Sequence, residues 1–262
     1  MTQAMITSAT ANTATEPWRY ILSAGRTGTV FLENLLSIYA PDVIAEHEPH
    51  PTRYQMMLGN MRNDLGLLKG TTRSWVHASR KSRDSQTPGP YIEINPFLCA
   101  VSDLLPDPDR PLRIVHIVRE PVSWASSMTV FKASTKYRGI IDFIPFAKPF
   151  PAPRPAGWQA LSQFEKNLHR WVWCNQRILD LADHAESFVS IRYEDLFSDQ
   201  DQKRITAVGK VFDGLGLASP ATIDWELFDT RVNPAPKSEI SFNQEATLEI
   251  TAPLATRLGY HD

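Results

Sequence analysis

The sequence predicts an α/β protein with a doubly wound, mostly parallel central sheet flanked by helices. Apolar runs alternate with helical patterns along the chain, which is typical of successive βα units. The run 112–118 is continuous and rich in β-branched residues, as expected for a central parallel strand. The stretch 18–39 passes from an apolar run through small residues to an apolar-periodic segment, which indicates strand, turn and helix.

The first half of the chain contains three predicted strands and three predicted helices. Pro41 ends the first helix, and Pro96 can start the third, because the first turn of a helix leaves its N–H groups unpaired. The polar, broken stretch 71–90 predicts a loop or a short helix. In order, the strands and helices are expected at 18–23, 29–39, 42–45, 53–68, 91–95 and 96–105.

The second half begins with the central strand, after which Pro121 opens a helix to about residue 131. The segment from about 132 to 158 contains several prolines and aromatic residues, which predicts an irregular lid or binding loop. We then expect a long helix at 161–182, a strand at 188–192, a helix at 203–215 and a loop-rich end.

Length and charge restrict the class of protein. A chain of 262 residues with 42% hydrophobic residues can bury one large core, so we expect a single domain at 17–262 after a disordered, Ser/Thr/Ala-rich lead-in at 1–16. A net charge of −2 argues against a general nucleic-acid binder. The sequence shows neither the apolar run of a membrane span nor the pattern of a secretory signal. We therefore expect a cytoplasmic protein without nucleic-acid or membrane partners, and allow for a homodimer.

Three reactive side chains are expected in the core. Cys99 and Cys174 lie in apolar surroundings without metal-ligand spacing, which predicts buried free thiols. His116 lies in the middle of the central strand, and a hydrogen-bonded core histidine is the simpler interpretation.

The segment "SAGRTGT" (23–29) lies between the first strand and the first helix, where a helix N-terminus attracts anions. Gly25 and Gly28 can adopt positive φ, and Thr27 and Thr29 add hydroxyls. The common nucleotide-hydrolase loop would place Lys directly after Gly28, but here the basic residue is Arg26. We therefore predict a P-loop-kinase-like fold whose loop holds a phosphate without a metal-bound triphosphate, and hence no metal. An ordinary βα turn is the alternative.

A second anion site is predicted after the central strand. Arg119 ends this strand, at the edge where open parallel sheets bind ligands, and its planar fork suits a phosphate. Ser123, Ser126 and Ser127 fall near one face of the next helix. The alternative pairs Arg119 with a carboxylate such as Glu120. Together, the two sites predict a nucleotide with two separate phosphates.

Three ordered segments resemble the sulfotransferases that use 3′-phosphoadenosine 5′-phosphosulfate (PAPS): "SAGRTGT", "REPVSWASS" and "IRYEDLF" (191–197). The resemblance implies that Arg26 contacts the sulfuryl group and the bridging oxygen, where its charge stabilises the breaking S–O bond. It also implies that Arg119 and Ser127 hold the 3′-phosphate and that Tyr193 lies near the adenine. Arg231 and Lys237 are looser candidates for completing the nucleotide site.

The general base is expected in "AEHEPHP" (45–51), just past the second strand. This segment resembles the His-Glu-Pro stretch of several bacterial and carbohydrate-type sulfotransferases and departs from the cytosolic phenol- and steroid-sulfating branch. Glu48 is the first choice, with His47 and Glu46 as alternatives. A solvated turn is the bland interpretation.

The implied reaction moves a sulfuryl group from PAPS to a hydroxyl or amine of a small molecule or carbohydrate. Loops 75–88 and 132–158 are candidates for the acceptor pocket, the second with both aromatic and basic side chains. The alternatives are a P-loop kinase of a nucleotide or small metabolite, and a non-catalytic nucleotide-binding relative. The missing lysine argues against the kinase, and the presence of Arg26 argues against the non-catalytic relative.

Overall fold

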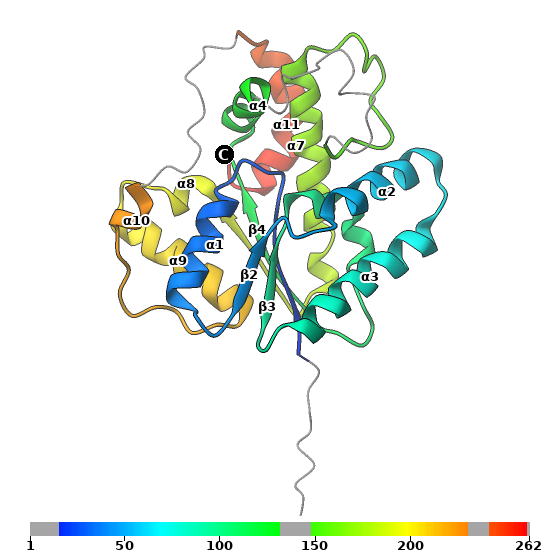
Figure 1. Cartoon of the computed structure of the whole chain (residues 1–262). Helices are drawn as coiled ribbons and strands as arrows, with labels where there is room; N and C mark the ends of the chain where they lie inside the picture. Colours follow the sequence, from blue (N-terminus) through cyan, green and yellow to red (C-terminus); the bar gives the residue numbers. More distant parts are fainter. Residues whose placement is uncertain (1–15, 132–147, 230–240, 261–262) are drawn as a thin grey trace, which may run out of the picture.

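The computed structural model describes residues 16–131, 148–229 and 241–260 of the chain (Figure 1). Five strands form one sheet in the order β2-β3-β1-β4-β5, and each neighbouring pair is parallel. This confirms the predicted α/β class. The strands are β1 Trp18–Ser23, β2 Ile44–His47, β3 Tyr91–Ile94, β4 Leu112–Val118 and β5 Ser187–Arg192.

Helices cover both faces of this sheet. The α-helices are α1 Thr29–Tyr39, α2 Thr52–Leu65, α3 Lys69–Gln86, α4 Pro121–Val130, α7 Gln163–Leu179, α8 Tyr193–Leu196, α9 Asp201–Leu215, α10 Glu226–Asp229 and α11 Gln244–Arg257. Two 3₁₀ helices are η1 Pro96–Leu104 and η2 Ala182–His184. In the part of the chain that the structure describes, no helix is both long and apolar enough to cross a bilayer.

The core consists of two hydrophobic clusters, one on each face of the sheet. In β1, Ile21 packs with α1 and α9, whereas Tyr20 and Leu22 face the cluster formed by η1, α4, α7 and α11. This alternation follows from the two-residue period of a strand. β1 is buried along its whole length, which explains why its sequence reads as a continuous apolar run.

Most of the elements around the predicted site form where they were expected. β1, α1 and β4 have the predicted bounds. β2 is a correction: it covers Ile44–His47 instead of 42–45, so His47 ends the strand rather than following it. The chain end is also less irregular than predicted, because α11 extends over 14 residues there.

The loop or short helix predicted at 71–90 is a correction, because most of this stretch belongs to the long, 18-residue helix α3. α3 buries a charged side chain: Arg80 is 1% exposed. Its guanidinium donates to the backbone carbonyls of Arg19 and Tyr91 and lies over the rings of Tyr20 and Tyr91, 4.7 Å from each centroid. At this position, charge and ring contacts replace aliphatic packing, so the sequence of the helix looked more polar than its burial requires.

The structure confirms the predicted core positions of the three reactive side chains. His116 is fully buried, with Nδ1 3.0 Å from Ser190 Oγ and Nε2 2.9 Å from Asn175 Oδ1. Burial lowers the His116 pKa to about 4, so the ring is neutral near pH 7. Cys99 and Cys174 are free, buried thiols with their sulfur atoms 3.3 Å apart.

The predicted lid falls only partly within the described residues. Its residues 132–147 lie outside them, and so do Arg231 and Lys237. The following segment 148–150 is buried and anchored: the Asn60 amide donates to the Lys148 carbonyl and accepts from the Phe150 N–H, and Arg170 donates to the Pro149 carbonyl. This end of the predicted lid is therefore part of the folded body.

Candidate active site

The candidate site lies at the carboxyl ends of the strands, where parallel sheets commonly bind ligands. β1 and β4 are direct neighbours, with Ser23 opposite Ile117. The segments that follow them, 24–28 and 119–120, therefore meet at one edge, as predicted from the sequence. β2 reaches the same edge two strands away, beyond β3.

The loop after β1 leads into α1 through an unusual backbone. Gly25 and Gly28 have φ values of 88° and 76°, and Arg26, between them, has a φ of 55°. A side chain at Gly28 would meet the Phe197 ring at 2.8 Å, so this position requires glycine. No side chain caps α1, and its first turn holds no acidic residue. Its N-terminal N–H groups and partial positive charge remain available to an anion.

Arg26 connects the two predicted anion sites. Its Nε donates to Ser127 Oγ on α4 at 3.2 Å, and its guanidinium lies 4.7 Å from the centroid of the Phe131 ring. Arg119 Nη1 donates to the Arg26 carbonyl at 3.2 Å. Partial burial lowers the pKa of Arg26, and the nearby Arg119 guanidinium lowers it further. Two cations held this close to each other favour an anion between or beside them.

Arg119 is fixed by neutral partners. Its Nε and Nη2 donate to Ser123 Oγ at 3.0 and 2.7 Å, and its guanidinium lies over the Tyr193 ring at 4.7 Å. Among the described residues, no carboxylate forms an ion pair with it. Glu120 instead caps α4 by accepting from the N–H groups of Val122 and Ser123. The expected alternative, a pair between Arg119 and Glu120, is therefore wrong.

The two threonines of the loop differ in surroundings. Thr27 is 1% exposed, and its enclosed hydroxyl has no hydrogen-bond partner among the described residues. Thr29, at the start of α1, places Oγ1 2.9 Å from Nε2 of His47. The start of α1, which follows the predicted phosphate loop, and the segment predicted to hold the general base are thus in direct contact.

The three candidate bases do not share one location. Glu48 has a φ of 48°, and its Oε1 lies 3.7 Å from His47 Nε2. Glu46, one residue before the end of β2, accepts a 2.7 Å hydrogen bond from the hydroxyl of Tyr91 on β3. His47 and Glu48 therefore adjoin the loop, whereas the Glu46 carboxylate is engaged elsewhere. Backbone strain at a non-glycine residue is concentrated at functional positions, and Glu48 and Arg26 both show it.

Sequence reasoning missed several side chains that shape this site. Trp124 donates from Nε1 to the Gly25 carbonyl at 2.6 Å, and Trp171 donates to the Arg119 carbonyl at 2.8 Å. Phe131 and Phe197 pack against Arg26 and Gly28. Their aromatic character was visible in the sequence, but no spacing rule identifies a partner 52 or more residues away.

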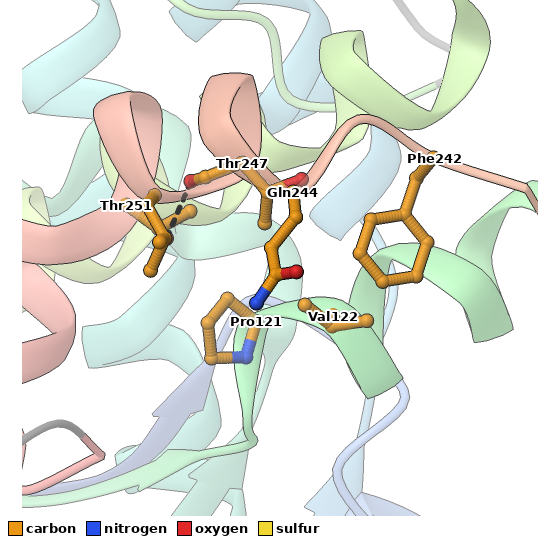
Figure 2. Close-up of a pocket in the computed structure, with 7 residues that line it drawn as sticks. Pro121, Val122, Phe242, Gln244, Thr247 and Thr251 are labelled. Atoms are coloured by element: carbon orange, nitrogen blue, oxygen red, sulfur yellow. Dashed lines mark hydrogen bonds between the residues drawn. The ribbon is translucent and has the colours of Figure 1, made fainter.

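A pocket of about 400 Å³ lies beside this site, between the first turn of α4 and α11 (Figure 2). None of the predicted site residues lines it. Its lining is uncharged and consists of Pro121, Val122, Phe242, Gln244, Thr247, Leu248 and Thr251. The two arginines, and not this pocket, define the candidate site.

Comparisons with known proteins identify the fold of this chain. No protein-family model matches the chain, and no curated protein matches it by sequence. Among solved structures, it is similar to a sulfotransferase domain from the curacin biosynthetic pathway, with a TM-score of 0.53 and 14% identity over 94% of this chain and 99% of that domain. It is also similar to the sulfotransferase domain of the Synechococcus PCC 7002 olefin synthase, with a TM-score of 0.51 and 18% identity over 91% and 94% of the two chains.

The architecture and the paired arginines first define an α/β protein with a glycine-containing loop after β1 and two cationic side chains beyond the ends of β1 and β4. More specifically, the chain has the fold of sulfotransferase domains, as the resemblance of its three segments predicted. At these identities the likeness establishes the fold, and the activity has to be argued from the site.

Proposed function

We propose that the protein is a PAPS-dependent sulfotransferase that transfers a sulfuryl group to a hydroxyl or amine of a small-molecule or carbohydrate acceptor. The contact between Arg26 and Arg119 at the ends of β1 and β4 carries this proposal. It provides two cationic positions on neighbouring loops, as a nucleotide with separate 3′- and 5′-phosphates requires. The fold of sulfotransferase domains supports the same assignment.

The nucleotide would be held by the two loops and the start of α1. The uncapped N-terminus of α1 suits the 5′-phosphate, through backbone N–H groups next to Gly28. Arg119 and Ser127 suit the 3′-phosphate, and the Tyr193 ring lies close enough to Arg119 to border the adenine. The start of α4 is a poor alternative for a phosphate, because Glu120 already occupies its N–H groups.

The chemistry assigns one task to each side of the reacting sulfur. Glu48 accepts the proton of the acceptor hydroxyl while the oxygen of that hydroxyl forms a bond to sulfur. The bond between sulfur and the 5′-phosphate oxygen breaks, and Arg26 stabilises the charge that develops on that oxygen. The products are a sulfate ester (or a sulfamate from an amine) and adenosine 3′,5′-bisphosphate.

Ligand-dependent thermal stability tests this proposal without knowledge of the acceptor. A ligand that binds only the folded state raises the melting temperature. We expect adenosine 3′,5′-bisphosphate to stabilise the protein and ATP with Mg²⁺ to have little effect. A preference for ATP with Mg²⁺ would instead support a P-loop kinase and contradict the sulfotransferase proposal.

Arg119→Ala is expected to weaken binding of adenosine 3′,5′-bisphosphate by about ten- to a hundred-fold, since it removes charge-assisted hydrogen bonds to the 3′-phosphate. Affinity for adenosine 5′-phosphate, measured by calorimetry, should change much less. Arg113→Ala is the matched control, because Arg113 lies near the other end of β4 and pairs with Glu186. Equal losses for both nucleotides would refute the assigned contact with the 3′-phosphate.

A further inference from the structure

The hydrogen bond between Thr29 and His47 joins the phosphate loop to the candidate base. Thr29 begins α1, His47 ends β2, and Thr29 Oγ1 lies 2.9 Å from His47 Nε2. The same Nε2 is 3.7 Å from Oε1 of Glu48. One ring nitrogen therefore faces both the loop that would hold the 5′-phosphate and the carboxylate that would take the proton.

The backbone fixes His47 in this place. Its N–H donates to Oε1 of Glu33 on α1 at 3.0 Å, and the next residue, Glu48, donates its N–H to the Ile94 carbonyl at 3.0 Å. The His47 side chain is about one fifth exposed. α1 thus holds the end of β2 through two hydrogen bonds, one with Glu33 and one with Thr29.

The proton count of the Thr29 hydroxyl gives this contact a function. A hydroxyl has one proton to donate but can also accept. In the free protein, Thr29 can donate to Nε2 or accept from it, depending on the tautomer of the ring. A phosphate oxygen only accepts. If Thr29 donates its hydroxyl proton to a phosphate oxygen, its oxygen can only accept in the hydrogen bond with His47. Nε2 of His47 must then carry a proton.

We propose that His47 is a positioning residue whose Nε2 is protonated when the nucleotide is bound, so that occupation of the phosphate loop orients Glu48. This inference rests on the proposed function. The Nε2–H group, held by the Thr29 hydroxyl, also faces the Glu48 carboxylate and restricts its orientation. Nε2 then cannot accept a proton from the acceptor, which assigns that role to Glu48 among the side chains facing the loop.

The protonation of His47 can be read directly by NMR. In ¹⁵N-histidine-labelled full-length protein at pH 8, long-range ¹H–¹⁵N spectra distinguish the two tautomers, and His47→Gln identifies the signal. With saturating adenosine 3′,5′-bisphosphate, we expect Nε2 of His47 to be protonated. In Thr29→Val, which removes only the hydroxyl, the nucleotide should leave the tautomer of His47 unchanged.

The outcomes separate this inference from the function on which it rests. Binding of the bisphosphate with an unprotonated Nε2 would overturn the inference and leave the sulfotransferase proposal intact. Failure of the bisphosphate to bind, followed in the same samples by thermal shift, would overturn both. A tautomer that responds to the nucleotide equally in Thr29→Val would overturn the role of the hydroxyl.

Kinetics provide a second test with two matched substitutions. The side-chain amide of His47→Gln can still donate at about the position of Nε2, so kcat should stay within about ten-fold of wild type. His47→Leu keeps the bulk without a donor, and kcat should fall about a hundred-fold with little change in nucleotide KM, as expected for a misplaced base. If His47→Gln loses as much as His47→Leu and also loses the acidic limb of the pH–rate profile, His47 is the base and the proposal fails.

Discussion

Replacing Arg26 by alanine is expected to lower kcat about a hundred- to a thousand-fold, because it removes the preorganised positive charge beside the oxygen on which negative charge develops. The affinity for adenosine 3′,5′-bisphosphate should stay within about three-fold of wild type. The structure gives a reason for this separation: the Arg26 side chain is bonded to Ser127, and its removal frees that hydroxyl for the 3′-phosphate. Single-turnover rates with PAPS measure the effect, using the best acceptor from a panel of phenols, alcohols, amines and sugars.

Two further substitutions at this position make the result interpretable. Arg26→Lys retains a cation and should recover part of the rate, although lysine lacks the planar fork of the guanidinium. Arg26→Gly suits the φ of 55° at this position and removes the same charge as alanine, so it controls for backbone strain. Equal losses of turnover and nucleotide affinity in Arg26→Ala would contradict a role in the transition state.

The succession of strands and helices along the chain and the edge of the sheet at which the site lies could be predicted, because the first depends on local patterns and the second on the parallel sheet they indicate. A β-branched run such as Leu112–Val118 is difficult to interpret as anything other than a buried parallel strand. Once β1 and β4 are neighbours, the residues that follow them have to meet. The positions of Arg26 and Arg119 therefore followed from sequence and topology alone.

The contacts within the site could not be predicted, because they depend on side-chain direction across long sequence separations. The bond from Arg26 to Ser127 spans 101 positions. The bond from Thr29 to His47 required β2 to extend two residues further than predicted. The positive φ of Glu48 has no signature in the sequence, because nothing in "HEP" indicates a left-handed backbone at the glutamate. Burial of a charged side chain misled the prediction of α3 in the same way, since pattern rules count Arg80 as a surface residue.

Glu48→Gln and Glu48→Gly are expected to lower kcat about 10²- to 10⁴-fold, because neither side chain can take the proton of the acceptor. Their effects on stability should differ. Glutamine keeps the shape of the side chain, and the free energy of unfolding should hardly change. Glycine relieves the left-handed backbone at φ 48°, which should raise the free energy of unfolding by about 1 kcal/mol, measured by urea denaturation. Loss of activity together with a gain in stability would indicate strain that is kept for function.

Leu68→Gly is the matched control for the backbone effect. Leu68 also has a left-handed φ, of 66°, but it lies in the exposed turn between α2 and α3. The same substitution there should stabilise the fold to a similar extent and leave turnover unchanged. If Glu48→Gln retains full activity, Glu48 is not the base. If Glu48→Gly destabilises the protein while Leu68→Gly stabilises it, the Glu48 side chain contributes more to the fold than its backbone strain costs, and the position is structural.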